Sequence, residues 1–151
     1  MKLSKVLSAA IACSHFAPIA AEFEWAGTFA SNDSKHHWMA QKVGGSYVDP
    51  SMRIVFYSIT DPSSQESIEQ HEADAKALID SDDGSCVDVT SGETMDPSVK
   101  PCYTLIFDQS SDDSKYIINT EGLTGFVAFA QHVPIEFERD MHYLQDSAGE
   151  L

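Results

Sequence analysis

The sequence predicts a mainly β fold, an antiparallel β-sandwich or a small barrel with one surface helix at about residues 64–80. Short segments rich in apolar and β-branched residues recur between turns built from Gly, Pro, Asn, Asp and Ser. Helical spacing of apolar residues occurs in one stretch, so the segments do not alternate with helices as βαβ units require. An α+β fold, with the helix laid across one sheet, is the alternative.

Three strands are expected in the first part of the chain. In residues 22–30 aromatic residues and Gly27 alternate with polar residues, which is typical of a half-buried strand. Residues 36–43 predict a second strand, which ends at a Gly-Gly turn. Residues 52–59 are apolar on both faces and therefore predict a central strand of the core.

The apolar period changes at residue 64, where the helix is expected to begin. Ile68, Ala75, Leu78 and Ile79 fall at near-helical spacing among charged residues, and the serines before them are suitable N-caps. Further strands are expected at residues 86–90, 103–108, 115–120, 126–137 with an interruption at Pro134, and 141–144.

Residues 1–21 have the pattern of a cleavable signal peptide. Lys2 and Lys5 precede an apolar stretch at residues 6–20, which is too short to span a bilayer, and two alanines offer a cleavage site. The remaining residues 22–151 are expected to form a single β-rich domain. We therefore expect a secreted or extracellular protein, periplasmic if the host is a bacterium, with no membrane span after the signal is removed.

Removal of the signal leaves two cysteines, Cys86 and Cys102, which are expected to form a disulfide in an oxidising compartment. The loop between them holds Gly92, Pro97 and Pro101 and many polar residues, so a structural staple is favoured over a redox pair. Export through a eukaryotic secretory pathway would also make Asn32, in the sequence Asn-Asp-Ser, a glycosylation site.

The chain is strongly acidic, with nine Lys and Arg against 24 Asp and Glu and a net charge of −15. Without residues 1–21, seven basic residues face 24 acids, which gives −17. Such a field repels nucleic acids and anionic membrane surfaces. It favours a cation or a basic protein as the partner, and it also keeps a secreted protein in solution.

A glycan is a further candidate partner, because the chain is rich in aromatic residues. A sugar-binding platform would need two or three rings in one plane on one face. Trp25 and Trp38 are the best pair for such a platform.

The segment from His132 to His142 is the sharpest candidate site. On a strand, Val133, Ile135 and Phe137 would face the core, and the opposite face would carry His132, Glu136, Glu138 and His142. Imidazoles and carboxylates are ligands for Zn²⁺ or another divalent metal. Strand residues four apart lie about 13 Å from each other, so a site also needs a bend at Pro134 or a ligand from elsewhere.

His36 and His37 are the candidate ligands from another strand, and because they are adjacent only one of them could face a given site. Ca²⁺ ranks below a transition metal. The acidic turn at residues 80–84 resembles the opening of a calcium loop, but it lacks the glutamate that closes an EF-hand. Residues 112–113 form another acidic turn, which could hold Ca²⁺ only weakly.

The sequence thus favours a secreted acidic binding domain for a metal ion, a cationic partner or a glycan. A small metal-dependent enzyme with His132, His142 and either His36 or His37 is the first alternative, since such a set leaves a position open for water. A structural protein of an extracellular matrix or wall is the second. No nucleophile motif or phosphate-binding loop supports another chemistry.

Overall fold

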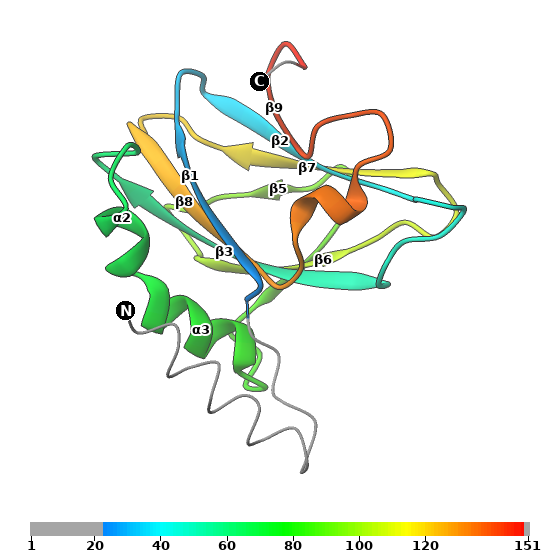
Figure 1. Cartoon of the computed structure of the whole chain (residues 1–151), viewed down its shortest axis with the longest axis horizontal. Coiled ribbons are helices and arrows are strands. Elements are labelled where there is room, and N and C mark those ends of the chain that lie inside the picture. Colours follow the sequence, from blue (N-terminus) through cyan, green and yellow to red (C-terminus); the bar gives the residue numbers. More distant parts are fainter. Residues whose placement is uncertain (1–22, 150–151) are drawn as a thin grey trace.

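The computed structural model describes residues 23–149, and the predicted signal peptide lies outside them. Two β-sheets face each other, and a helical segment lies against the outer face of one of them (Figure 1). Within this part of the chain the sheets do not close into a barrel. The protein is therefore mainly β and sandwich-like, as the strand pattern predicts.

The larger sheet has five strands in the order β1-β8-β3-β6-β4. The central β3 is apolar on both faces, which agrees with its sequence. β4 is parallel to β6, whereas the other neighbours are antiparallel. The strands are β1 (Trp25–Ala30), β3 (Ser51–Ile59), β4 (Val87–Thr90), β6 (Cys102–Ile106) and β8 (Gly125–Ala130).

The smaller sheet has four strands in the order β5-β7-β2-β9. They are β2 (Lys35–Gln41), β5 (Thr94–Met95), β7 (Asp113–Asn119) and β9 (Leu144–Asp146). β5 pairs in parallel with β7. The sequence does not predict this strand, because a strand of two residues is too short to show an alternating pattern. The outermost strands of this smaller sheet, β5 and β9, are both short, which limits the unpaired backbone that the sheet offers to another chain.

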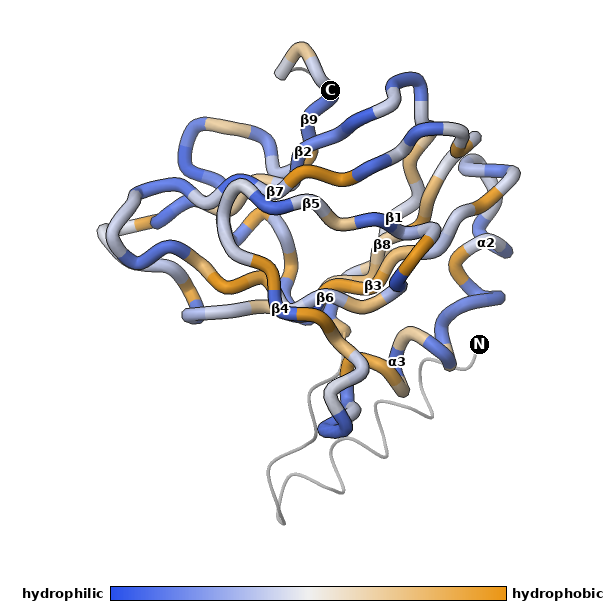
Figure 2. The backbone as a smooth tube through the Cα atoms, turned by 180° about the vertical axis from the view of Figure 1, so that it is seen from behind, coloured by the Kyte–Doolittle hydropathy of each residue, from blue (hydrophilic) through white to orange (hydrophobic). Residues whose placement is uncertain are grey.

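The predicted helix is present as two pieces, α2 (Glu66–Glu69) and α3 (Glu72–Asp80). Ala75 and Ile79 of α3 are fully buried and pack with Val55 and Phe129 on the outer face of the larger sheet. Hydrophilic residues extend along much of α2 (Figure 2). The helical segment therefore forms a second, smaller core outside the sandwich.

The main core lies between the sheets and is largely aromatic, with Trp38, Phe56, Tyr116 and Phe126 fully buried. The Tyr116 hydroxyl donates to the carbonyl of Ile106 at 2.5 Å, so this buried polar group is satisfied.

The indole of Trp25 lies over Gly27 in the same strand. A Cβ at Gly27 would be 2.5 Å from the Trp25 ring, far inside van der Waals contact. Glycine is therefore required at position 27 for Trp25 to pack as it does.

The strand predicted for residues 126–137 is wrong in its second half. β8 ends at Ala130, and η1 (Pro134–Phe137) is a 3₁₀-helix. Pro134 lacks the N–H that a ladder needs and has a φ suited to the first helical position. The last strand, expected at residues 141–144, lies further along the chain as β9, Leu144–Asp146, and shares only residue 144 with the prediction. Residues 132–142 therefore do not form one strand, and their side chains do not alternate between two faces as predicted.

The Cys86–Cys102 disulfide is present, with the two Cα atoms 4.5 Å apart. It joins the residue before β4 to the first residue of β6. Among the described residues, no helix has the length and apolar character needed to cross a membrane.

Candidate metal centre

His132 lies just beyond the end of β8, where three separate parts of the chain bring carboxylates to it. Glu24 precedes β1, and its N–H donates to the carbonyl of Ala130 at 3.0 Å, which places Glu24 beside the end of β8. Asp49 belongs to the turn before β3, and Glu136 lies in η1. The imidazole is half-buried, and its edge contacts the ring of Phe137.

Asp49 fixes the tautomer of His132. The Asp49 carboxylate is 2.9 Å from Nε2 of His132, so Nε2–H donates to Asp49. In the neutral imidazole the other ring nitrogen, Nδ1, then carries a lone pair, and it lies 3.8 Å from the Glu24 carboxylate. A carboxylate behind a histidine is the usual support for a metal-bound imidazole.

Glu24, His132 and Glu136 are the one group of three metal-ligating residues within reach of each other in the described part of the chain. Their ligand atoms all lie within 4.8 Å of one another. Glu24 and Glu136 are exposed, so an ion from solvent reaches the group directly. Of the six predicted ligands the structure brings together His132 and Glu136, and it adds Glu24, which sequence reasoning missed.

Glu138 and His142 are a separate pair. His142 Nδ1 lies 3.8 Å from the Glu138 carboxylate, which also accepts from the backbone N–H of Tyr143 at 2.8 Å. The turn after η1 carries this pair away from Glu136, since the segment is not the single strand that the prediction assumed.

His36 and His37 lie on β2, both buried and on opposite faces. Nδ1 of His36 donates to the Thr120 hydroxyl at 2.9 Å, and His37 Nδ1 lies 3.4 Å from the carbonyl of Asp146 in β9. Neither belongs to the group at His132, and no group in the described part of the chain holds more than one histidine. The three-histidine arrangement of the enzyme alternative is therefore not formed there.

The buried histidines predict acid sensitivity. Burial lowers the pKa of His36, although Asp33 and Asp146 oppose the shift, and burial followed by the charge of Lys115 lowers the pKa of His37. Below the unfolded pKa of about 6.5 the unfolded chain therefore binds more protons than the folded one, and the free energy of unfolding should fall as the pH drops.

The His36→Asn, His37→Asn variant should lose this slope between about pH 6.5 and pH 5, in urea unfolding measured across that range. Asparagine keeps a donor near the position of Nδ1 but does not titrate. An unchanged slope would show that other groups cause the acid sensitivity.

The remaining predicted features are placed as follows. Asp83 accepts from Ser81 and Ser85, and Asp113 accepts from Gln41 and Arg139, so each acidic turn has a carboxylate that already binds protein donors. Trp38 is 1% exposed and its ring is inclined at 61° to that of Trp25, so this pair offers no flat sugar-binding platform. Asn32 is exposed in the turn between β1 and β2.

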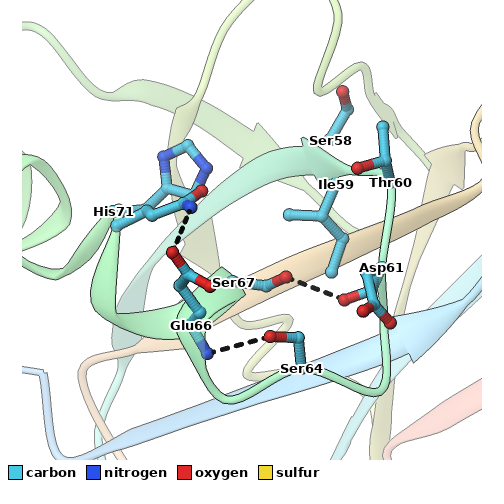
Figure 3. Close-up of a pocket in the computed structure, with 9 residues that line it drawn as sticks. Ser58, Ile59, Thr60, Asp61, Ser64, Glu66, Ser67 and His71 are labelled. Carbon is cyan, nitrogen blue, oxygen red and sulfur yellow. Dashed lines mark hydrogen bonds between the residues drawn. The ribbon is translucent and has the colours of Figure 1, made fainter.

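A polar hollow of about 320 Å³ lies between the end of β3 and α2 (Figure 3). Several of its polar groups already bind one another. Ser67 donates to the Asp61 carbonyl at 2.7 Å, and Ser64 accepts from the N–H of Glu66 at 3.2 Å. The group at His132 is therefore the stronger candidate site.

The fold and this group define a disulfide-bonded, sandwich-like β domain with a candidate metal centre at one end of β8. Comparison of the chain with protein-family models, curated proteins and solved structures finds no match.

Proposed function

We propose that the protein is a secreted acidic binding domain that takes a divalent metal cation, Zn²⁺ in first place, at Glu24, His132 and Glu136. The disulfide and the charge of the chain support an extracellular setting and attraction of cations. Asp49 would act behind the metal, as the acceptor that orients the imidazole.

The observation that carries the proposal is the position of His132 between two carboxylates, which in its neutral form turns Nδ1 as an acceptor toward the Glu24 carboxylate. With Nε2–H committed to Asp49, the lone pair of His132 Nδ1 points to the region of the Glu24 carboxylate, 3.8 Å away. Two such acceptors repel each other unless a proton or a cation lies between them. A tetrahedral Zn²⁺ about 2.1 Å from both atoms needs roughly 3.4 Å between them, so a small side-chain movement is sufficient.

The ligand set favours a first-row metal over Ca²⁺. One imidazole with carboxylates suits Zn²⁺, whereas Ca²⁺ takes six to eight oxygen ligands. Three protein ligands also leave a fourth position for water. The alternative function, a small metal-dependent enzyme, would depend on a water at that position.

Zn²⁺ added to the metal-free full chain is expected to bind with one-to-one stoichiometry, and His132→Ala should abolish binding. Asp49→Asn should weaken binding about 10- to 100-fold, because a neutral amide oxygen is a weaker acceptor for Nε2–H than the carboxylate and supports the imidazole less. Isothermal titration calorimetry at pH 7 measures both, and the affinity should fall at acidic pH because ligands must be deprotonated.

His142→Ala is the matched control, since His142 is also an accessible imidazole beside a carboxylate but lies outside the group. Its Zn²⁺ affinity should equal that of the native chain. Equal affinities for His132→Ala and the native chain, or the absence of any binding, would rule out this centre.

A further inference from the structure

A second hollow, of about 360 Å³, lies on the outer face of the larger sheet just beyond the C-terminal end of α3. Arg53 and Thr104 are register partners on β3 and β6, and alternation points both side chains away from the main core. None of the residues proposed to hold the metal lines this hollow. Its lining is Ser51, Arg53, Ile79, Asp80, Asp82, Thr104 and Gln131.

Asp80 lines this hollow and carries a carboxylate oxygen that no donor among the described residues uses. Its Oδ2 lies 3.4 Å from Nζ of Lys76. Its Oδ1 is buried and has no hydrogen-bond partner among residues 23–149. Buried polar atoms are nearly always paired, because an unpaired one loses its hydration without compensation. Oδ1 is therefore an acceptor left without a donor by the described residues, which a small turn of the Asp80 side chain would offer to a ligand in the hollow.

Two planar side chains beside Asp80 are held in place by their own hydrogen bonds. Nη1 of Arg53 donates to the carbonyls of Ile79 and Ser81 at 2.6 and 2.5 Å, which fixes the guanidinium at the end of α3. Oε1 of Gln131 accepts from the N–H of Arg53 at 3.0 Å. Since Oε1 is engaged, the amide Nε2 remains as a donor for a ligand.

The charges of the hollow disfavour an anionic ligand. One arginine faces two aspartates, and two backbone carbonyls already occupy an edge of that guanidinium. What remains is an acceptor at Asp80 Oδ1, a donor at Gln131 and the hydroxyls of Ser51 and Thr104. Neighbouring hydroxyls of a sugar both donate and accept, so they match such a mixed set. The volume is at the small end of ligand pockets.

We propose that this hollow binds one neutral sugar residue of a glycan. One sugar hydroxyl donates to Asp80 Oδ1, and its neighbour accepts from Gln131 Nε2. This proposal is independent of the metal centre, and it assigns a glycan contact without the Trp25–Trp38 platform.

The test is a titration of the ¹⁵N-labelled full chain with the methyl glycosides of glucose, mannose and galactose, each in turn, followed by NMR. At least one glycoside should shift the Gln131 side-chain amide and the Thr104 backbone amide in a saturable way. Asp80→Asn should weaken that binding at least about tenfold. Because Lys76 donates to one side of residue 80, the asparagine oxygen should turn to Lys76 and its NH₂ should replace the acceptor in the hollow.

Lys76→Met is the matched control, because it removes the same ion pair but leaves Oδ1 in place, and its affinity should be unchanged. Thermal unfolding of each variant shows that the fold is retained. Absence of saturable shifts up to about 100 mM of all three glycosides, or equal affinity of Asp80→Asn and the native chain, would overturn the proposal. Binding of 1,4-diaminobutane at these residues in place of the glycosides would assign the hollow to amines.

Discussion

Replacing Gln41 by glutamate is expected to lower the free energy of unfolding by about 3–5 kcal/mol at pH 7. The Gln41 side chain is fully buried on the outer face of β2, where the turn after η1 covers it. Its Oε1 accepts from the backbone N–H groups of Arg139, Asp140 and Met141 at 3.0, 3.1 and 3.0 Å. Its Nε2 donates to Asp113 at 3.1 Å and to Asp140 at 2.7 Å.

The substitution would turn a donor into a third carboxylate beside two others. The bond from Gln41 is the main cause that lowers the pKa of Asp140, and it would be lost. Burial and repulsion would raise the pKa of the introduced carboxyl above the ordinary glutamate value of about 4.3. The folded variant then binds more protons than the unfolded one, so the loss should be small near pH 4 and grow as the pH rises through the raised pKa.

Urea unfolding of the variant and the native chain at matched pH values between about 4 and 8 measures this difference. Gln65→Glu is the control, because Gln65 is exposed before α2 and the same change there should stay within about 0.5 kcal/mol. A loss for Gln41→Glu that does not vary with pH would show that repulsion is not its cause.

The sequence predicts a strand well where the apolar pattern within that strand reflects its burial. Alternation in β1 and the apolar run of β3 report the environment of each strand directly, and both strands lie where they are predicted. Residues 133–137 show the limit of this reasoning. Their apolar alternation resembles a strand, but Ile135 is 63% exposed in η1, because Pro134 interrupts the ladder.

The candidate metal centre is only half visible in the sequence. His132 and Glu136 are close in the chain, so composition alone draws attention to them. Glu24 reaches His132 through the pairing of β1 with β8, and Asp49 reaches it through the turn before β3. Contacts between segments about one hundred residues apart depend on topology, which one sequence does not determine.

Replacing both Cys86 and Cys102 by alanine is expected to lower the free energy of unfolding by about 3 kcal/mol. The cysteines are 16 residues apart, and the loop they close contains both β4 and β5. β4 joins the larger sheet and β5 joins the smaller one, each in parallel to its neighbour. The disulfide therefore restricts a loop that contributes a strand to each of the two sheets of the sandwich.

This placement gives the second prediction a local signature. Without the bond, the loop has more conformational freedom in the unfolded chain, so ordering it on folding costs more entropy. In addition, β4 and β5 have few other contacts that hold them in place. Hydrogen exchange of residues 87–95 should therefore accelerate more than that of the central β3 and β8. Urea unfolding gives the total loss, and mass spectrometry of the native chain should show a gain of two hydrogens on reduction. Uniform acceleration across all strands would mean that the disulfide stabilises the domain without a particular role for this loop.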